Sequence, residues 1–372
     1  MLKKLILGVG LLSGSVIGAG VFALPYVIYR AGWVIGAIYI ITFTVLVTVS
    51  HIMYAQVVEI TPGDHRLVGF SKIYLGKFSE WTATLVSPIG LLLTLTAYLV
   101  LGEKFLLLFM PANYGGTAFL IIWLLGTLVI FWETGKLALA EVLGTLSIAA
   151  IIFVIFGYGL SNWSGLAATP AINPQYIFLP YGAMLFAMWG RTAIPPLVRY
   201  FRDDNKLNLI KPAIILGVIV PVVLYALFIV GAIELTAPHI TGSSISGLAA
   251  ALPQGIVWSV GVLGILAILT SYAVIGKNIH QTIIFDVKQK PYIGASVVAV
   301  VPLLLYILGF KDFLYLVNII GGVFLSIEGI LMTVLWIKAR RGVESWNKLY
   351  GFAVYLLLVI FTGGIIYSLV YR

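Results

Sequence analysis

The stretch Gly20-Val21-Phe22-Ala23-Leu24-Pro25 returns in the second half of the chain as Gly190-Arg191-Thr192-Ala193-Ile194-Pro195. Both copies fit the pattern G-x-x-A-[LI]-P, and both lie inside long apolar stretches. In a helix interior, glycine costs about 1 kcal/mol and proline about 3 kcal/mol relative to alanine. In lipid, the backbone groups freed by such a break must find partners or line a cavity. Two breaks at corresponding places in two halves of a chain therefore predict a transport site near the membrane midplane.

The composition is typical of a polytopic membrane protein. Of the 372 residues, 61% are hydrophobic and 9% are charged, and the mean hydropathy is +1.11. Soluble domains carry about 25% charged residues. No polar stretch is long enough to form a separate soluble domain, and the absence of cysteine excludes disulfides and thiolate metal sites.

Eleven apolar windows are long enough to cross the hydrocarbon core, which takes about twenty residues of helix. They fall at roughly 5–29, 33–58, 81–109, 117–132, 138–160, 176–198, 211–233, 256–276, 292–309, 313–338 and 350–370. The first window contains the first motif, so we expect it to remain as a membrane helix rather than to be removed as a signal peptide.

The basic residues predict the orientation through the positive-inside rule. With the N-terminus inside, the segments predicted to be cytoplasmic contain Lys3, Lys4, Arg66, Lys72, Lys77, Lys136, Arg199, Arg202, Lys206, Lys211, Lys277, Lys288, Lys290, Lys338, Arg340, Arg341 and Lys348. Outside or near the outer ends lie Arg30, Lys104, Lys311 and Arg372, while Arg191 lies within a helix. This bias accounts for the net charge of +9, so no nucleic-acid partner is expected, and the C-terminus is predicted outside.

The helices divide into two halves of five, at about 1–160 and 175–340, followed by an extra helix at about 348–372. Because each half has an odd number of spans, the second enters the membrane from the opposite side, and the repeat is predicted to be inverted. The two motifs then fall in helices one and six. We expect one all-α transmembrane domain over residues 1–372.

The first break has two interpretations. Ser13-Gly14-Ser15-Val16-Ile17-Gly18-Ala19-Gly20 holds small residues, which allow close packing of membrane helices. The same glycines followed by Pro25 favour local unwinding, which leaves carbonyls at the end of one half-helix and amides at the start of the next. With the helix dipole, the first end suits a cation and the second a carboxylate. Unwinding therefore predicts a site for an amino acid and a coupling ion.

Several motifs resemble one family. Ile17-Gly18-Ala19-Gly20-Val21-Phe22-Ala23-Leu24-Pro25-Tyr26, followed by Ala31-Gly32-Trp33, resembles the first-helix signature of the amino acid/auxin permease family, close to its aromatic amino acid permeases. The stretch from Phe186 to Pro195 resembles the sixth helix, and Ala97-Tyr98-Leu99, Thr270-Ser271-Tyr272, Pro302, Gly321-Gly322 and Trp336 also fit. The resemblance implies the fold of the bacterial leucine transporter and its amino acid, polyamine and organocation relatives. We expect a prokaryotic cytoplasmic membrane as the location.

The resemblance implies roles for residues in both breaks. Carbonyls of Gly14 and Ile17 are expected to face a sodium-type site, and amides of Ala19 and Gly20 to hold the substrate carboxylate. By symmetry with the first break, the first half of helix six ends in carbonyls of Ala187 and Met188, which are expected to accept hydrogen bonds from the substrate ammonium. Trp189 either closes the pocket or packs between helices. Ser15, Gly18 and Gly190 complete the predicted substrate site.

Arg191 departs from the family pattern, in which a neutral or histidine-type residue is expected. A buried guanidinium is costly when unpaired and indicates function by default. One interpretation is a structural ion pair with Glu141 or Glu328. The others are a fixed cation near the substrate carboxylate and a partner in proton coupling.

Helices three, five and eight supply further candidates. Ala267, Thr270 and Ser271 offer a carbonyl and two hydroxyls, the oxygen ligands that hard cations take, although serine and threonine also bond to helix carbonyls. Thr94 and Tyr98 lie four residues apart on one face, and Tyr98 is a candidate ligand for the substrate carboxylate, with interhelical packing as the alternative. Glu141 is a candidate proton carrier because a buried carboxyl group retains a proton more readily. The coupling ion is thus a proton or sodium, and no other cofactor or metal is expected.

The leading interpretation is a secondary active transporter that moves a neutral, large apolar or aromatic amino acid by ion-coupled symport and alternating access. The phosphate-binding pattern G-x-x-x-x-G-K-[ST] is absent, which argues against ATP-driven transport. The four histidines form no H-E-x-x-H, and G-x-S-x-G is missing, so an enzyme is not expected. A channel or an amino acid sensor on the same fold is the alternative. No obligatory protein partner is evident.

Overall fold

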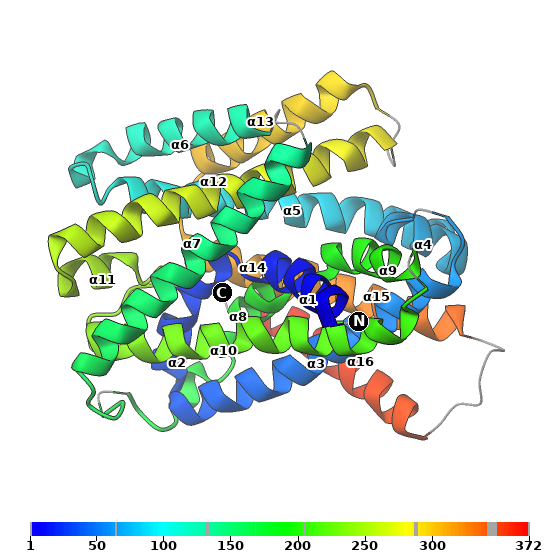
Figure 1. Ribbon diagram of the computed structural model, residues 1–372, viewed down its shortest axis with the longest axis horizontal. Helices are drawn as coiled ribbons and strands as arrows, with labels where there is room; N and C mark the ends of the chain where they lie inside the picture. The colour runs from blue at the N-terminus through cyan, green and yellow to red at the C-terminus, as the bar shows by residue number, and fades with distance from the viewer. Residues whose placement is uncertain are drawn as a thin grey trace.

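The computed structural model describes residues 2–63, 65–130, 134–167, 169–203, 205–285, 289–340 and 348–370, apart from the side chains of 134–141, 285 and 348–350. All regular secondary structure in these residues is helical, and they contain no strand (Figure 1). The α-helices are α1 (Leu2–Val16), α2 (Leu24–Ala31), α3 (Trp33–Ile60), α4 (Leu67–Leu75), α5 (Lys77–Leu106), α6 (Gly115–Val129), α7 (Thr134–Ser161), α8 (Pro180–Met188), α9 (Ile194–Arg202), α10 (Ile210–Thr236), α11 (Ile245–Ala251), α12 (Gln254–Phe285), α13 (Pro291–Ile307), α14 (Phe313–Ile319), α15 (Ser326–Ala339) and α16 (Lys348–Val370). Short 3-10 segments are η1 (Ala19–Ala23), η2 (Ala112–Tyr114), η3 (Pro174–Tyr176), η4 (Arg191–Ala193) and η5 (Leu207–Leu209), and η6 (Ile320–Leu325) is a π-helical segment.

The described residues contain eight helices long and apolar enough to cross a membrane, or nine if the bent pair α1 and η1–α2 forms one span. This number is lower than the eleven predicted windows because two windows correspond to shorter helices. The window at 292–309 corresponds to α13, which has 17 residues, and the window at 176–198 is divided between α8 and α9, which have nine residues each. The number of spans and the inverted repeat stay predictions.

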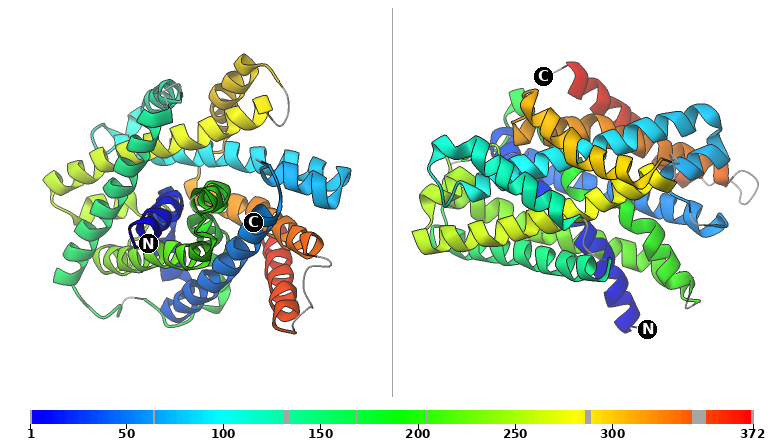
Figure 2. Two further views of the ribbon diagram at one scale, coloured as in Figure 1. Left: turned by 45° about the vertical axis from the view of Figure 1, so that its right-hand side comes forward. Right: turned by 90° about the horizontal axis from the view of Figure 1, so that it is seen from above.

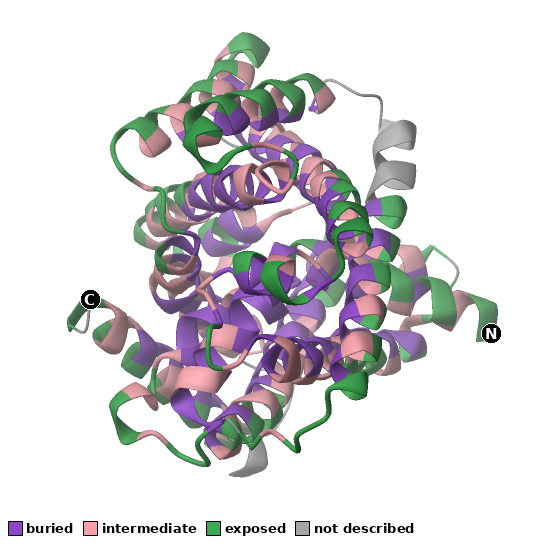
Figure 3. Cartoon of the chain, turned by 90° about the vertical axis from the view of Figure 1, so that its left-hand side faces the viewer, coloured by how far each residue is buried: buried purple, intermediate pink, exposed green. Residues whose placement is uncertain are grey.

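The surface of the bundle is apolar, as expected where lipid replaces water. Large side chains such as Ile41, Leu128 and Phe352 are exposed, while the backbone polar groups are satisfied inside helices. Figure 3 shows buried residues concentrated in the interior and exposed ones along the outer helices. The chain is an integral membrane protein.

The two broken helices lie in the interior of the bundle. Figure 2 (left) shows α1 and the α8–α9 region enclosed by other helices. In Figure 1, α5 and α12 pass on one side of them and α3 and α10 on the other. Helix α7 contacts both α10 and α12, α1 packs on α10, and α3 packs on α8. The breaks are thus surrounded by long, continuous helices.

Both breaks have the same backbone plan. Helix α1 ends at Val16, Gly18 is extended, and η1 leads into α2 with a bend of 50°. Helix α8 ends at Met188, Trp189 is extended, and η4 leads into α9. The motif prolines do not interrupt a helix: each lies in the first turn of the following one, where a missing N–H costs no hydrogen bond.

A third irregularity was not predicted from the sequence. The segment η6 is π-helical and joins α14 to α15. A Cβ at Gly321 would lie 1.9 Å from the carbonyl oxygen of Gly182 in α8, so the two backbones meet directly. The hydroxyl of Ser326 donates to the Gly321 carbonyl at 3.2 Å and bonds with Tyr181 Oη at 2.9 Å. The wider turn therefore fits α8 against this helix and places Phe324 and Leu325 at the cavity described below.

Candidate functional site between two helix breaks

A cavity of about 120 Å³ lies between the two breaks. This volume is several times the roughly 10–15 Å³ that one water molecule needs on the same type of measure. Its lining comes from the first break, α5, α7, the second break, α12 and the η6–α15 segment: Gly14, Ser15, Val16, Ile17, Gly18, Gly20, Ser87, Gly90, Leu91, Thr94, Tyr98, Thr145, Phe186, Ala187, Trp189, Arg191, Thr192, Ser271, Val274, Ile275, Asn278, Phe324, Leu325 and Glu328. The cavity combines a polar end with a largely apolar, aromatic wall.

Close neighbours leave little room for side chains at the glycines of the first break. A Cβ at Gly20 would lie 2.7 Å from the Cα atom of Ala187, so the two breaks touch backbone to backbone. A Cβ at Gly18 would lie 3.3 Å from Tyr98 Oη, which places the tyrosine hydroxyl directly at the first break. Packing and local unwinding, offered as alternatives for these glycines, both apply.

The hydroxyl of Tyr225 connects the two broken helices from α10. Tyr225 Oη is 2.7 Å from the Val16 carbonyl oxygen, at the end of α1, and 3.0 Å from the Ala187 carbonyl oxygen, near the end of α8. Both carbonyls lie in the last turn of their helix, where intrahelical donors run out. The single proton of this buried hydroxyl is therefore shared between two helix ends. One of the two carbonyls, that of Ala187, was predicted to bind the substrate ammonium.

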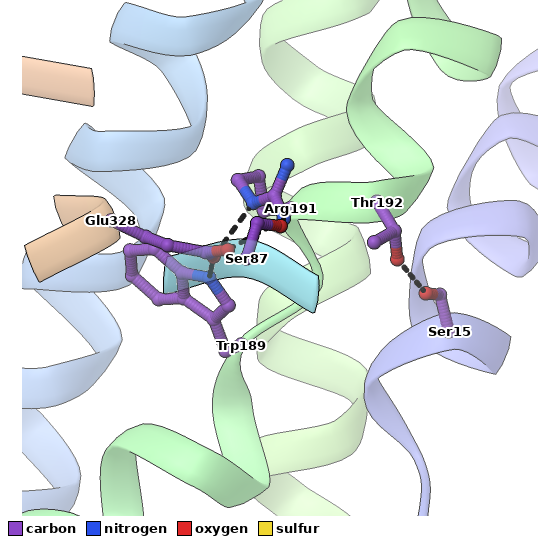
Figure 4. Close-up of polar contacts among 6 residues, drawn as sticks. All are labelled: Ser15, Ser87, Trp189, Arg191, Thr192 and Glu328. Atoms are coloured by element: carbon purple, nitrogen blue, oxygen red, sulfur yellow. Dashed lines mark hydrogen bonds and ion pairs between the residues drawn. The ribbon is translucent and has the colours of Figure 1, made fainter. Parts of the chain in front are cut away.

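The second break carries a bidentate ion pair. Arg191 Nε donates to Glu328 Oε2 at 2.8 Å, and Arg191 Nη2 donates to Glu328 Oε1 at 2.8 Å and to Ser87 Oγ at 3.0 Å. Trp189 Nε1 donates to Glu328 Oε2 at 3.1 Å. The two charged residues are 7% and 3% exposed. Figure 4 shows this group on one side of the break and the Ser15–Thr192 contact, at 3.5 Å, on the other.

His51 of α3 lies behind the second break. Its imidazole is fully buried, its ring centroid is 5.6 Å from that of Trp189, and both ring nitrogens have no hydrogen-bond partner among the described residues. A Cβ at Gly190 would lie 3.6 Å from His51 Cε1. Such unpartnered groups are unusual in folded proteins, so this histidine stands out beside the charged cluster.

The predicted cation ligands are only partly brought together. Gly14, Ile17 and Ser271 line the cavity, and Thr145 of α7, not predicted, lies 3.6 Å from the Cβ position at Gly14. Ala267 and Thr270 do not line it. Thr270 Oγ1 donates to the Ala267 carbonyl at 3.0 Å, which is the helix back-bonding named as the alternative, and Thr270 packs against Gly144.

The predicted substrate residues also divide into two groups. The residues that line the cavity are Ser15, Gly18, Gly20, Thr94, Tyr98, Ala187, Trp189 and Arg191. Ala19, Met188 and Gly190 do not line it, and Ala19 and Met188 are each 1% exposed. The hydroxyl of Thr94 donates to the Gly90 carbonyl at 2.8 Å. Of the two carboxylates considered for Arg191, the structure pairs it with Glu328, while the side chain of Glu141 in α7 falls outside the described residues.

A second, larger space adjoins the cavity. It measures about 720 Å³ and shares Ser87, Arg191, Thr192, Val274 and Asn278 with the cavity lining. Three further basic residues, Arg66, Arg199 and Lys277, also line this vestibule. On the far side of the first break, the buried ring of Phe22 packs edge-on against those of Phe105 and Phe228, with centroids 5.2 and 5.4 Å away. The cavity is therefore continuous with the vestibule through these shared residues, whereas the three aromatic rings do not line it and pack in the buried interior.

Solved structures and a curated protein resemble this chain over nearly its whole length. The chain superposes on MhsT, crystallised in complex with L-phenylalanine, with a TM-score of 0.68 and 13% identity, covering 97% of both chains. Mhp1, a nucleobase-cation-symport-1 family transporter, gives a TM-score of 0.61 and 14% identity over 97% of this chain and 89% of that one. The chain is also 21% identical to tyrosine-specific transport system 1 of Haemophilus influenzae over 96% of this chain and 94% of that protein.

The fold is therefore that of these transporters, as the sequence motifs predicted. A family-level match is more extensive still, since the tryptophan/tyrosine permease family matches residues 1–370. Membership in a permease family makes the chain a transport protein rather than an enzyme. The chain belongs to the tryptophan/tyrosine permease family.

Proposed function

We propose that this protein is a secondary active transporter that moves a neutral, aromatic or large apolar amino acid by ion-coupled symport. Two observations carry the proposal: the match to the tryptophan/tyrosine permease family over residues 1–370, and a cavity enclosed by two helix breaks in the interior of the bundle. Broken helices with a binding site between them are the arrangement on which alternating access depends in many secondary transporters.

The cavity wall favours an aromatic substrate. Phe186, Trp189, Phe324 and Tyr98 contribute rings, and Leu91 adds aliphatic surface. Aromatic groups gain from offset or edge-on contacts with other rings in addition to the apolar area they bury. The tyrosine-specific transport system of Haemophilus influenzae and the L-phenylalanine complex of MhsT involve substrates or ligands of the same class.

Two positions suit the substrate carboxylate. One is the first break, where the amides of Ala19 and Gly20 begin η1 and the hydroxyl of Tyr98 approaches Gly18. The other is the guanidinium of Arg191, which faces the same cavity. The ammonium group would bind carbonyls at the end of α8, in competition with the hydroxyl of Tyr225.

The coupling ion would be a proton or sodium. Oxygen atoms of Gly14, Ile17 and Ser271, with Thr145, are the candidate sodium ligands, because hard cations take oxygen donors. For a proton, Glu141 and Glu328 are the candidate carriers.

The predicted topology indicates which side of the membrane the vestibule would face. Arg66, Arg199 and Lys277 fall in segments predicted to be cytoplasmic, so the vestibule would face the cytoplasm and the Phe22 cluster the outside. The structure would then represent an inward-facing state of an eleven-helix protein with inverted five-helix repeats, in a prokaryotic cytoplasmic membrane. Transport would require the broken helices to move against α3, α5, α10 and α12.

A counterflow screen of the twenty amino acids in proteoliposomes tests this function. We expect exchange of tyrosine, tryptophan or phenylalanine and accumulation when a pH or sodium gradient is imposed. Gradient-driven accumulation separates the transporter from its alternatives, because a channel cannot accumulate substrate and a sensor binds without turnover. If the folded protein exchanged none of the twenty amino acids, the proposed function would be contradicted.

A further inference from the structure

We propose that Glu328 carries the coupling proton and that the substrate carboxylate replaces Glu328 on Arg191. This inference rests on the proposed transport function and assigns its coupling step to named atoms. It begins from the position of the ion pair, because both Arg191 and Glu328 line the cavity between the breaks. Among the residues that the structure describes, Glu328 is also the only carboxylate that lines either the cavity or the vestibule.

Glu328 already occupies the bidentate edge that Nε and Nη2 of Arg191 form. Glu328 and Ser87 together occupy three of the five N–H donors of Arg191, and both oxygens of Glu328 bond to the guanidinium fork. A substrate carboxylate entering this small, buried cavity would bring a second negative charge beside the first. Two carboxylates that share one site do not both remain ionised, because their repulsion favours protonation of one of them.

The exchange balances in atoms and charge. A proton from water bonds to one Glu328 oxygen, the two hydrogen bonds from Arg191 to that carboxylate break, and the substrate carboxylate accepts hydrogen bonds from Arg191 instead. Trp189 Nε1 and Ser87 Oγ remain beside the protonated Glu328 and Arg191, respectively. When substrate leaves on the other side of the membrane, Glu328 releases its proton to water and pairs again with Arg191. One proton accompanies each amino acid.

Other charged and titratable groups surround the pair but are placed differently. His51 of α3 packs on Trp189 beside the pair, and Tyr54, His65, Arg66, Arg199 and Lys277 line the vestibule. Two histidines are rival proton carriers. His51 is fully buried and lines neither the cavity nor the vestibule, and His65 lines the vestibule but not the cavity that holds Arg191 and Glu328. Glu328 is also buried, but in contrast it lines the cavity that the substrate is proposed to enter.

The test compares accumulation with exchange in proteoliposomes. With one proton per substrate, a gradient of one pH unit supports a concentration ratio of about tenfold in the wild type. Glu328→Gln is expected to retain counterflow of the best substrate while its accumulation ratio falls to about 1. Glu80→Gln is the matched control, because Glu80 pairs with Lys72 at the surface, away from the cavity, and it should accumulate as the wild type does.

The outcomes separate the inference from the function beneath it. Three results would each overturn the role of Glu328 while leaving the transport function intact. The first is proton-driven accumulation by Glu328→Gln, and the second is accumulation driven by sodium alone in the wild type. The third is loss of coupling in His51→Gln or Glu141→Gln while Glu328→Gln retains it. Failure of the wild type to exchange any amino acid would instead remove the transport function.

A second measurement covers the case in which Glu328→Gln does not fold. Wild-type protein in weakly buffered detergent solution should take up about one proton per molecule when substrate is added, detected with a pH-sensitive dye. Arg191→Lys, which keeps the charge but loses the bidentate fork, should reduce both substrate affinity and this proton uptake. Substrate binding without proton uptake at any pH between 5 and 9 would overturn the proposal.

Discussion

The two helix breaks share a backbone plan but differ in chemistry. Each passes through an extended residue and a 3-10 segment into a helix with proline in its first turn. The first break is neutral and built from Gly18, Ala19 and Gly20, whereas the second carries Arg191, paired with Glu328. The shared motif therefore determines where the helices bend, and the residues between its fixed positions determine what each bend can bind.

The difference also appears in how each break is supported. The first break is held by close backbone approach, because Gly20 meets Ala187 without room for a side chain. The second is held by a hydrogen-bonded cluster that draws on α5 and α15. A larger side chain at Gly20 should thus destabilise the first break, while the loss of a charged side chain should destabilise the second.

The largest effect is expected from Glu328→Ala, which removes one partner of the buried pair. An uncompensated buried charge costs about 3–5 kcal/mol, so the midpoint of thermal unfolding in detergent should fall steeply. Replacing both residues, Arg191→Met with Glu328→Met, should restore much of the stability but not transport. A Glu328→Ala protein that unfolds at the wild-type temperature would show that the second break does not depend on its ion pair.

A smaller loss is expected from Gly20→Ala at the first break. The new Cβ would lie 2.7 Å from the backbone of Ala187, and overpacking of this kind typically costs about 1–3 kcal/mol. Gly10→Ala in α1 is the matched control because nothing lies within 4 Å of its Cβ position; there alanine should stabilise the helix slightly. Equal unfolding temperatures for the two variants would argue against close contact between the breaks.

Tyr225→Phe tests the link between the breaks. It removes the hydroxyl that reaches the Val16 and Ala187 carbonyls, at an expected cost of about 1 kcal/mol. We also expect a changed substrate KM, since the Ala187 carbonyl becomes available to an ammonium group. Tyr355→Phe, at an exposed position of α16, should leave both values as they are. Unchanged stability and KM in Tyr225→Phe would mean that the two breaks are not joined through α10.

Ser15→Ala should have the smallest effect. The Ser15–Thr192 contact is 3.5 Å long, at the limit of a hydrogen bond, so its loss should cost less than about 0.5 kcal/mol. Thermal unfolding in detergent measures this directly. A loss comparable with that of Tyr225→Phe would show that this contact, rather than the buried tyrosine, joins the breaks.

Sequence reasoning located both breaks, the family and eleven of the 24 residues that line the cavity, because glycine, proline and apolar periodicity act locally. It named Glu328 as a possible partner of Arg191 but could not choose between Glu328 and Glu141, since neither is near Arg191 in the chain. Tyr225 gave no signal at all: a tyrosine in an apolar helix is ordinary until its hydroxyl is seen between two helix ends. Ser87 was missed for the same reason.

The sequence by itself determined that this is a polytopic helical membrane protein with two interrupted helices, because composition and helix-breaking residues are properties of the chain. Only the tertiary structure decided that Gly20 meets Ala187, that η6 widens into a π-helical turn beside Gly182, and that Glu328 binds Arg191 inside the cavity. Those contacts join residues far apart in the chain. A charge or a free carbonyl that is buried away from water costs free energy unless it is hydrogen-bonded, and its partner is whichever group the packing places beside it.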